Sequence, residues 1–282
     1  MKNFIVRTIT GIFFVASIVI CFINPTAMTL LFALVTGLTI WEFTGLVNQR
    51  EGVDTNRFIC TVAGVYLFFA MSGFCSSLTP PTVFIPYLIT LVYLLVAELY
   101  AKSPDPVNNW AYTMFSQLYV ALPFSLLSVL AFRATPDGVT YTYTIPLCVF
   151  VFLWINDTGA YCSGSLLGRH KLFPRVSPGK SWEGSIGGAV FVIAAAALVW
   201  HLTESYGVND LGLNMYQWMG LGVVVVVFGT WGDLVESLFK RTLGIKDSGT
   251  ILPGHGGMLD RFDSSLLAIP AAVVYLYTLT LF

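Results

Sequence analysis

Two short segments of this chain concentrate the side chains that could do chemistry. Segment 157–183 carries six charged residues and segment 233–263 carries nine, so 15 of the 29 charges lie within 58 residues. Two of the three histidines, His170 and His255, lie in these segments as well. Carboxylates and basic side chains grouped in this way can bind phosphates and a hard cation such as Mg²⁺. The two segments are therefore the first places to look for a functional site.

Asp233 is the carboxylate with the most informative position, because it follows the unbroken apolar run 223–228. In a helix of about 3.6 residues per turn, Asp233, Ser237 and Lys240 lie on one face, with Asp233 about two turns deeper than Lys240. A carboxylate at such a depth needs a cation. That cation could be a metal ion, which would make Asp233 a metal ligand, or the ammonium group of Lys240.

The segment after this helix contains a glycine-rich turn, residues 254–257, in which three glycines surround a histidine. Such a turn can expose successive backbone N–H groups, which bind phosphate oxygens, especially near a helix N-terminus. Lys246 and Arg261 could pair with phosphate as well. Asp260 and Asp263, spaced i and i+3, could present oxygens to Mg²⁺. Taken alone, Asp260 could instead be a helix N-cap, and the histidine an ordinary loop residue.

The other charged segment starts with Asp157 inside an apolar run and continues into a polar loop. Residues 179–181 of this loop, Gly-Lys-Ser, resemble the end of a P-loop. Pro174 stands where that motif requires glycine, so a Walker A site is excluded. A loop with a lysine and hydroxyl groups could still bind a triphosphate. It could equally be a positively charged membrane anchor with Trp182 at the interface.

The composition predicts the kind of secondary structure that positions these residues. Hydrophobic residues make up 56% of the 282 residues and charged residues 10%, against about 25% charged in soluble domains. A soluble enzyme is therefore excluded. A spanning helix needs about 20 mostly apolar residues, and nine stretches approach or reach that length: 4–23, 27–47, 58–78, 82–100, 110–132, 141–163, 184–203, 215–240 and 264–282. We predict an all-α, polytopic integral membrane protein with nine transmembrane helices and a single membrane-embedded domain over residues 1–282.

The basic residues predict the orientation of these helices, because Lys and Arg concentrate in short cytoplasmic loops. With the N-terminus in the cytosol, 13 of the 14 basic residues fall on the cytosolic side, and Arg133 falls outside. Both charged segments then face the cytosol. If the protein is bacterial, the membrane is the inner membrane. The stretch 4–23 could also be a cleaved signal peptide, and its removal would leave the orientation of the later helices unchanged.

Other features of the composition exclude several kinds of partner. The five cysteines form no C-x-x-C pair, so neither a metal cluster nor a disulfide framework is indicated. The net charge of -1 gives no basic surface for nucleic acid. The expected partner is the lipid bilayer.

The run 237–263 resembles the signature of the phosphatidate cytidylyltransferases. That pattern is Ser-x-apolar-Lys-Arg, four residues, Lys-Asp-x-small, then apolar-Pro-x-His-Gly-Gly-apolar-x-Asp-Arg-x-Asp, and the sequence fills every position. The segments 177–184 and 157–161 resemble two further motifs of the same family. These three motifs account for most of the charged residues in the two segments.

The resemblance implies a Mg²⁺-dependent enzyme of phospholipid biosynthesis that transfers CMP from CTP to phosphatidic acid, giving CDP-diacylglycerol and pyrophosphate. It also implies a homodimer, and it allows a monovalent cation beside Mg²⁺. By the resemblance, the metal ligands are Asp233 and Asp260, which together with Lys246 and Arg261 are the catalytic residues. The substrate-binding residues are expected to be Ser177, Lys180, Ser181, Lys240, Arg241, Asp247, His255, Gly256, Gly257 and Asp263. The carboxylates that could complete or orient the metal shell are Asp157, Glu183 and Glu236.

Three other classes of protein share some of these features. A secondary transporter carries carboxylates near the bilayer midplane, often in inverted repeats, whereas the charges here are one-sided and no repeat is found. A CTP-dependent polyprenol or phytol kinase would transfer phosphate in place of CMP, and the complete signature argues against it. An accessory scaffold without activity is a third alternative, and the unsubstituted acidic positions of the motifs argue against it.

Overall fold

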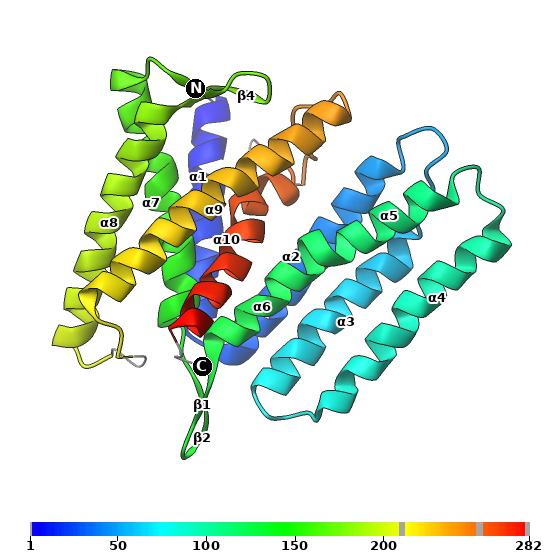
Figure 1. The fold of residues 1–282 in the computed structure, drawn as a ribbon, viewed down its shortest axis with the longest axis horizontal. Helices are drawn as coiled ribbons and strands as arrows, with labels where there is room; N and C mark the ends of the chain where they lie inside the picture. The colour runs from blue at the N-terminus through cyan, green and yellow to red at the C-terminus, as the bar shows by residue number, and fades with distance from the viewer. Residues whose placement is uncertain (1, 209–211, 252–255, 280–282) are drawn as a thin grey trace. The chain divides into compact units, whose positions relative to one another are not determined.

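The computed structural model describes residues 2–208, 212–251 and 256–279, with side chains from residue 10 onward (Figure 1). The chain forms two compact units that interleave along the sequence. The first unit comprises Met1–Tyr143 and Thr242–Phe262, and the second comprises Thr144–Arg241 and Asp263–Phe282. The signature segment 237–263 is therefore divided between the two units.

The first unit is a set of helices, of which α2, α3, α4 and the continuous α5–α6 helix run side by side (Figure 1). Its helices and helical turns before residue 132 are α1 (Lys2–Phe22), α2 (Pro25–Val47), α3 (Arg57–Cys75), the 3-10 turn η1 (Pro81–Phe84), α4 (Ile85–Ala101), α5 (Pro106–Ser116), the π-helical turn η2 (Gln117–Ala121) and α6 (Leu122–Ala131). The rings of Phe32, Phe124 and Phe262 pack against one another in its core, with centroids 5.4 to 6.2 Å apart. Phe262 therefore anchors the end of the signature segment in this unit.

The second unit contains α7 (Thr144–Leu167), the strands β3 (Lys171–Phe173) and β4 (Ser177–Ser181), α8 (Trp182–Ser205), α9 (Met215–Thr242) and most of α10 (Leu259–Thr278). α7 and α8 approach each other through small residues. A Cβ atom added at Gly184 would lie 2.9 Å from the Ala160 carbonyl oxygen, and one added at Gly188 would lie 2.8 Å from that of Asn156. Small residues allow such close approach of helix backbones, which is common between membrane helices.

All nine predicted stretches overlap helices in the described part of the chain. Within residues 2–208, 212–251 and 256–279, seven helical stretches are long and apolar enough to cross a membrane: Pro25–Val47, Arg57–Cys75, Pro81–Ala101, Pro106–Ala131, Thr144–Leu167, Trp182–Ser205 and Met215–Thr242. The first and last predicted stretches correspond to α1 and α10, which are not among these seven. The prediction of a helical membrane protein is confirmed, and the count of nine spans stays a prediction.

The sequence analysis did not predict two short β-hairpins. The strands β1 (Phe132–Thr135) and β2 (Gly138–Tyr141) are antiparallel, with Thr135 opposite Gly138. The local signal was present, because Asp137-Gly138 is a dipeptide that favours tight hairpin turns, and Gly138 takes a φ of +126° that suits glycine. The second hairpin, β3–β4, lies in the charged loop between α7 and α8. Both hairpins connect the ends of two successive apolar helices, α6 to α7 and α7 to α8.

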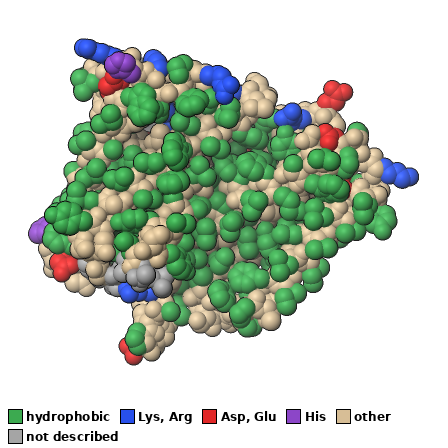
Figure 2. All heavy atoms as spheres, viewed as in Figure 1, with side chains coloured by type: hydrophobic (Ala, Val, Ile, Leu, Met, Phe, Trp, Pro, Cys, Tyr) green, Lys and Arg blue, Asp and Glu red, His purple; other side chains and the backbone are tan. Residues whose placement is uncertain are grey.

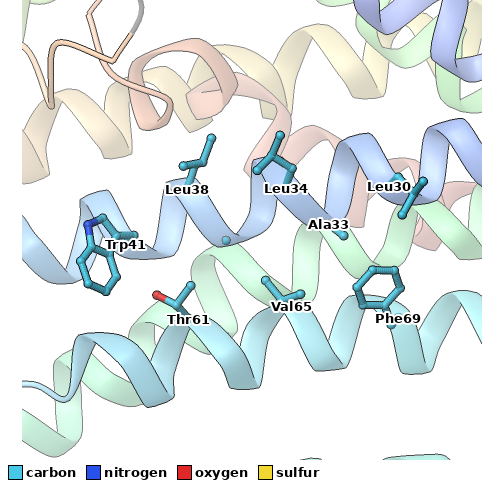
Figure 3. Close-up of a pocket in the computed structure, with 9 residues that line it drawn as sticks. Leu30, Ala33, Leu34, Leu38, Trp41, Thr61, Val65 and Phe69 are labelled. Atoms are coloured by element: carbon cyan, nitrogen blue, oxygen red, sulfur yellow. The ribbon is translucent and has the colours of Figure 1, made fainter.

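The surface is apolar over most of the face drawn in Figure 2, and charged side chains gather mainly toward its margins. This distribution suits helices that face lipid. The first unit also has a groove of about 550 Å³ between α2 and α3 (Figure 3). Its lining residues are Leu30, Ala33, Leu34, Gly37, Leu38, Trp41, Thr61, Val65 and Phe69. Since none of these nine is charged, the groove suits hydrocarbon and not a phosphate or a metal ion.

Candidate active site

A short hairpin and a helix start together position Lys180. β3 and β4 are antiparallel, with Lys171 opposite Ser181. α8 begins directly after β4, and the Ser181 hydroxyl oxygen accepts a hydrogen bond from the Gly184 N–H at 3.1 Å. Ser181 is thus the N-cap of α8. Because Lys180 immediately precedes this cap, its backbone position is set by both the strand and the helix.

Glu183, in the first turn of α8, holds the chain that leads into the hairpin. Its carboxylate accepts hydrogen bonds from the N–H groups of Arg169 at 3.1 Å and His170 at 3.2 Å, and it pairs with the His170 Nδ1 at 2.5 Å. These bonds join the end of α7 to the start of α8. The structure therefore gives Glu183 a part in shaping the loop, and its place in a metal shell stays a prediction.

Lys180 pairs with Asp233, the candidate metal ligand on α9. The ammonium group forms a salt bridge with Asp233 Oδ2, and the Ser237 hydroxyl donates a hydrogen bond to Asp233 Oδ1 at 3.1 Å. The side chains of Lys180 and Asp233 are each 27% exposed, so the pair is partly buried and still open to a ligand. The contact between Asp233 and Ser237 confirms their predicted common face. Lys240 pairs with Glu236 at 2.7 Å, one turn away on the same helix.

Two further predicted carboxylates lie near this pair. Asp263, on α10, is close enough to Asp233, Asp157 and Lys180 to interact electrostatically with each of them. The approach of α10 to α9 depends on Gly232, where an added Cβ would lie 2.7 Å from the Asp263 carbonyl oxygen. α7, α9 and α10 therefore each place a carboxylate in the surroundings of one lysine.

A cavity of about 440 Å³ opens beside this cluster, within the second unit. It is lined by Asn156, Asp157, Ala160, Tyr161, Gly164, Ser165, Gly179, Lys180, Ser181, Gly184, Ser185 and Thr230. The lining combines an ammonium group, a carboxylate and several hydroxyl groups, which suits a polar, anionic ligand. Asn156, which the sequence analysis did not select, forms a buried part of the wall with 5% of its surface exposed.

Asp260, the second candidate metal ligand, lies in the first turn of α10 and belongs to the first unit. Its Oδ2 accepts hydrogen bonds from the N–H groups of Ser248 and Gly257, each at 2.8 Å. In return, the Asp260 N–H donates to the Ser248 hydroxyl oxygen at 3.3 Å. An N-cap side chain binds N–H groups inside its helix, whereas these two donors precede α10. Asp260 therefore joins the signature loop to the helix start.

Glu42, on α2, is a residue of this region that the sequence analysis missed. Its side chain is almost fully buried, and its carboxylate accepts hydrogen bonds from the N–H groups of Met258 at 2.9 Å and Leu259 at 3.1 Å and from the Ser248 hydroxyl. A signal was present in the sequence, because Glu42 is an ionisable residue inside the apolar stretch 27–47. Such residues often mark a functional site.

A comparison with known proteins now decides the family. The model of the cytidylyltransferase family matches residues 5–279. The chain belongs to this family. Among its relatives, the phosphatidate cytidylyltransferase of Haemophilus influenzae is 33% identical over 279 residues, which cover 94% of this chain and 95% of the relative. Those of Staphylococcus haemolyticus and Staphylococcus aureus are 40% and 38% identical over 185 and 184 residues, 65% of each chain.

Family membership confirms the resemblance that was drawn from the signature segment. For the other predicted site residues of this cytidylyltransferase, the structure gives the element or the exposure. Ser177 begins β4, Glu236 is fully buried on α9, and the exposed ones are Arg241, Lys246, Asp247 and Arg261. Gly256 and Gly257 begin the final described part of the chain, and His255 lies outside the described residues.

The predicted magnesium ligands of the cytidylyltransferase, Asp233 in the second unit and Asp260 in the first, are of a residue type that suits this ion. Over the described ranges, no three His, Cys, Asp or Glu side chains are grouped so that they could hold a metal ion by themselves. Mg²⁺ is usually bound through one or two carboxylates, with substrate phosphates and water completing its shell. The carboxylates of Asp233 and Asp260 supply hard oxygen donors of the kind that this ion prefers.

Proposed function

We propose that this cytidylyltransferase transfers CMP from CTP to phosphatidic acid, forming CDP-diacylglycerol and releasing pyrophosphate. The observation that carries the proposal is the match, along almost the whole chain, to relatives named phosphatidate cytidylyltransferase. The site is consistent with this reaction, because Lys180 and the hydroxyl groups around the cavity of the second unit can receive phosphate oxygens. Apolar helices keep the protein where a lipid substrate is found.

The reaction forms one bond and breaks one bond. An oxygen of the lipid phosphate attacks the α-phosphorus of CTP, and the bond from that phosphorus to the oxygen bridging to the β-phosphorus breaks. The bonding electron pair leaves with pyrophosphate. A phosphomonoester is already anionic at neutral pH, so the reaction needs no strong general base. The protein contributes mainly by positioning the two substrates and neutralising their charge.

Each part of the site has a role in this scheme. Lys180 exchanges the carboxylate of Asp233 for a phosphate oxygen when CTP binds. Arg261 and Lys246 bind other phosphate oxygens, and the guanidinium group can do so through two hydrogen bonds. Asp233 and Asp260 would hold Mg²⁺, and the ion would offset part of the negative charge of the triphosphate.

The test is product analysis with purified protein. The protein is given CTP, phosphatidic acid and Mg²⁺, and both products are measured, the lipid by mass spectrometry and pyrophosphate by a coupled assay. We expect equal amounts of CDP-diacylglycerol and pyrophosphate, and neither product when EDTA is present. A folded, monodisperse protein that forms neither product with Mg²⁺ would contradict the proposal.

We also propose nine spans in a single membrane domain, with the N-terminus and the active site on the cytosolic side. The support is the one-sided distribution of 13 of the 14 basic residues. The test is labelling of single cysteines, in a variant without native cysteines, by a membrane-impermeant reagent. Lys102→Cys should react only in inverted vesicles and Asp137→Cys only in right-side-out vesicles, and the reverse pattern would refute the topology.

The family resemblance further suggests a homodimer. Light scattering of the purified protein in detergent, corrected for bound detergent, should give the mass of two chains. A mass of one chain across the accessible concentration range would contradict this part of the proposal.

A further inference from the structure

Glu42 makes contacts that the proposed reaction does not explain. It lies on α2 and is 8% exposed. Its Oε2 accepts a hydrogen bond from the Met258 N–H at 2.9 Å, and its Oε1 accepts one from the Leu259 N–H at 3.1 Å and one from the Ser248 hydroxyl. All of these residues belong to the first unit. One side chain of a membrane helix therefore binds the signature segment at three points.

The nature of these partners separates Glu42 from an ordinary ion pair. Within the described residues, its carboxylate is bound by two amides and a hydroxyl and by no basic side chain. A carboxylate in an apolar helix is costly unless such bonds satisfy it. Met258 and Leu259 lie at the start of α10, where N–H groups lack helical partners and negative charge is favoured. Glu42 thus supplies acceptors for the N–H groups of Met258 and Leu259 at the start of α10.

Two glycines of the signature leave the space that this carboxylate occupies. A Cβ added at Gly249 would lie 2.8 Å from Glu42 Oε2, and one added at Gly257 would overlap Glu42 Oε1. Any larger residue at Gly257 would displace the carboxylate or the loop. The two glycines and Glu42 therefore form one packed arrangement. This packing by itself favours glycine at positions 249 and 257.

The same arrangement leads directly to the candidate metal ligand. Ser248 donates its hydroxyl to Glu42, its N–H group donates to Asp260 Oδ2, and its hydroxyl oxygen accepts from the Asp260 N–H. We infer that Glu42 is a positioning residue of the cytidylyltransferase, which fixes the start of α10 and, through Ser248, sets the orientation of the Asp260 carboxylate. This inference rests on the proposed function, in which Asp260 holds Mg²⁺.

The test compares Glu42→Gln with two other variants. Gln keeps the shape of the side chain but replaces one accepting oxygen with an NH₂ group, which cannot accept a hydrogen bond. Ser248→Ala removes the connecting hydroxyl. Glu98→Gln is the matched control, because Glu98 is also a carboxylate on a membrane helix of the first unit, and it accepts a hydrogen bond from the side-chain amide of Asn109 at 3.1 Å.

Two readouts are measured for each variant, one of which needs no activity. Amide hydrogen exchange of Met258 and Leu259 should be faster in Glu42→Gln than in the wild type and unchanged in Glu98→Gln. The Mg²⁺ concentration that gives half-maximal CMP transfer should rise by about 10- to 100-fold in Glu42→Gln and in Ser248→Ala, as for other groups that orient a metal ligand. The two changes together should raise it by little more than either alone, because they act through one path.

Several outcomes would overturn the inference. Unchanged amide exchange in Glu42→Gln would show that the carboxylate does not fix the helix start. A lower melting temperature and lower maximal rate without a change in Mg²⁺ dependence would reduce Glu42 to a structural residue. If Glu42→Gln does not fold, Ser248→Ala decides, and normal Mg²⁺ dependence in that variant refutes the path to Asp260. A wild type that makes no CDP-diacylglycerol would refute the proposed function, whereas the exchange result would still test the role of Glu42.

Discussion

Replacing Asp233 with Asn separates the chemical role of this carboxylate from its structural role. The substitution keeps the volume of the side chain and an oxygen that can still accept the bond from Ser237, but it removes the charge that pairs with Lys180. If Asp233 holds the metal ion, CMP transfer should fall by at least about 100-fold, since even changes to groups behind a metal ligand cost about 10- to 100-fold.

The loss of stability should be much smaller than the loss of activity. Exposed ion pairs contribute about 0–1 kcal/mol to the free energy of unfolding. Removing one partner of a fully buried pair lowers it by about 3–5 kcal/mol. The two side chains are each 27% exposed, so solvent screens the lysine that remains, and we expect a loss of about 1 kcal/mol. For a chain of this size, that loss lowers the melting temperature by about 2–4 °C.

The assay compares three proteins, Asp233→Asn, Lys180→Met and the variant with both changes, by CMP transfer at saturating CTP and by thermal melting in detergent. In the double variant no lysine is left without its partner, so the melting temperature should return toward that of the wild type. CMP transfer should remain lost, because the charged carboxylate that would hold the metal ion is still missing. Wild-type turnover in Asp233→Asn, or recovery of turnover in the double variant, would refute the role of Asp233 as a metal ligand.

Further predictions concern the metal, two helix contacts and a control loop. EDTA should abolish CMP transfer and added Mg²⁺ should restore it, and transfer that continues in EDTA would contradict a metal-dependent reaction. Ser181→Ala should lower stability by about 1 kcal/mol through the lost N-cap of α8, measured as the melting temperature, and an unchanged value would argue against the cap. Gly188→Ala should cost about 1–3 kcal/mol, because its Cβ would lie 2.5 Å from Asn156 Oδ1. Gly179→Ala, with nothing within 4 Å of the added Cβ, should change stability by less than about 0.5 kcal/mol, and equal losses in both would refute the packing argument. Lys102→Ala, outside the motifs, should keep near-wild-type CMP transfer.

The helices were predictable because apolar runs of sufficient length report directly on membrane-spanning structure. The approach of Ser237 to Asp233 was predictable as well, because both lie on one helix and depend only on its period. The β1–β2 hairpin was not predicted although Asp137-Gly138 marked its turn, because its strands are only four residues each and lie between two long apolar runs. The features that were predicted depend on residues close together along the chain, and such local features follow most readily from sequence.

The contacts between distant segments could not be predicted from one sequence. Lys180 and Asp233 pair only because the β3–β4 hairpin and α9 meet in three dimensions, and periodicity pointed instead to Lys240 as a partner. Glu42 and Ser248 are 206 residues apart along the chain. The sequence marked Glu42 only as a carboxylate in an apolar stretch, and its partners are backbone amides, which carry no sequence signal. Its connection to Asp260 therefore required the structure.

The measurement that tests the central claim most directly follows each phosphate of CTP to its product. Purified protein and Mg²⁺ are incubated with phosphatidic acid or with a polyprenol, and with CTP labelled at either the α- or the γ-phosphate. Transfer of CMP predicts that the α-label appears in lipid only with phosphatidic acid and that the γ-label is released as pyrophosphate. Appearance of the γ-label on the polyprenol, with no α-label on phosphatidic acid, would contradict the account and identify a kinase.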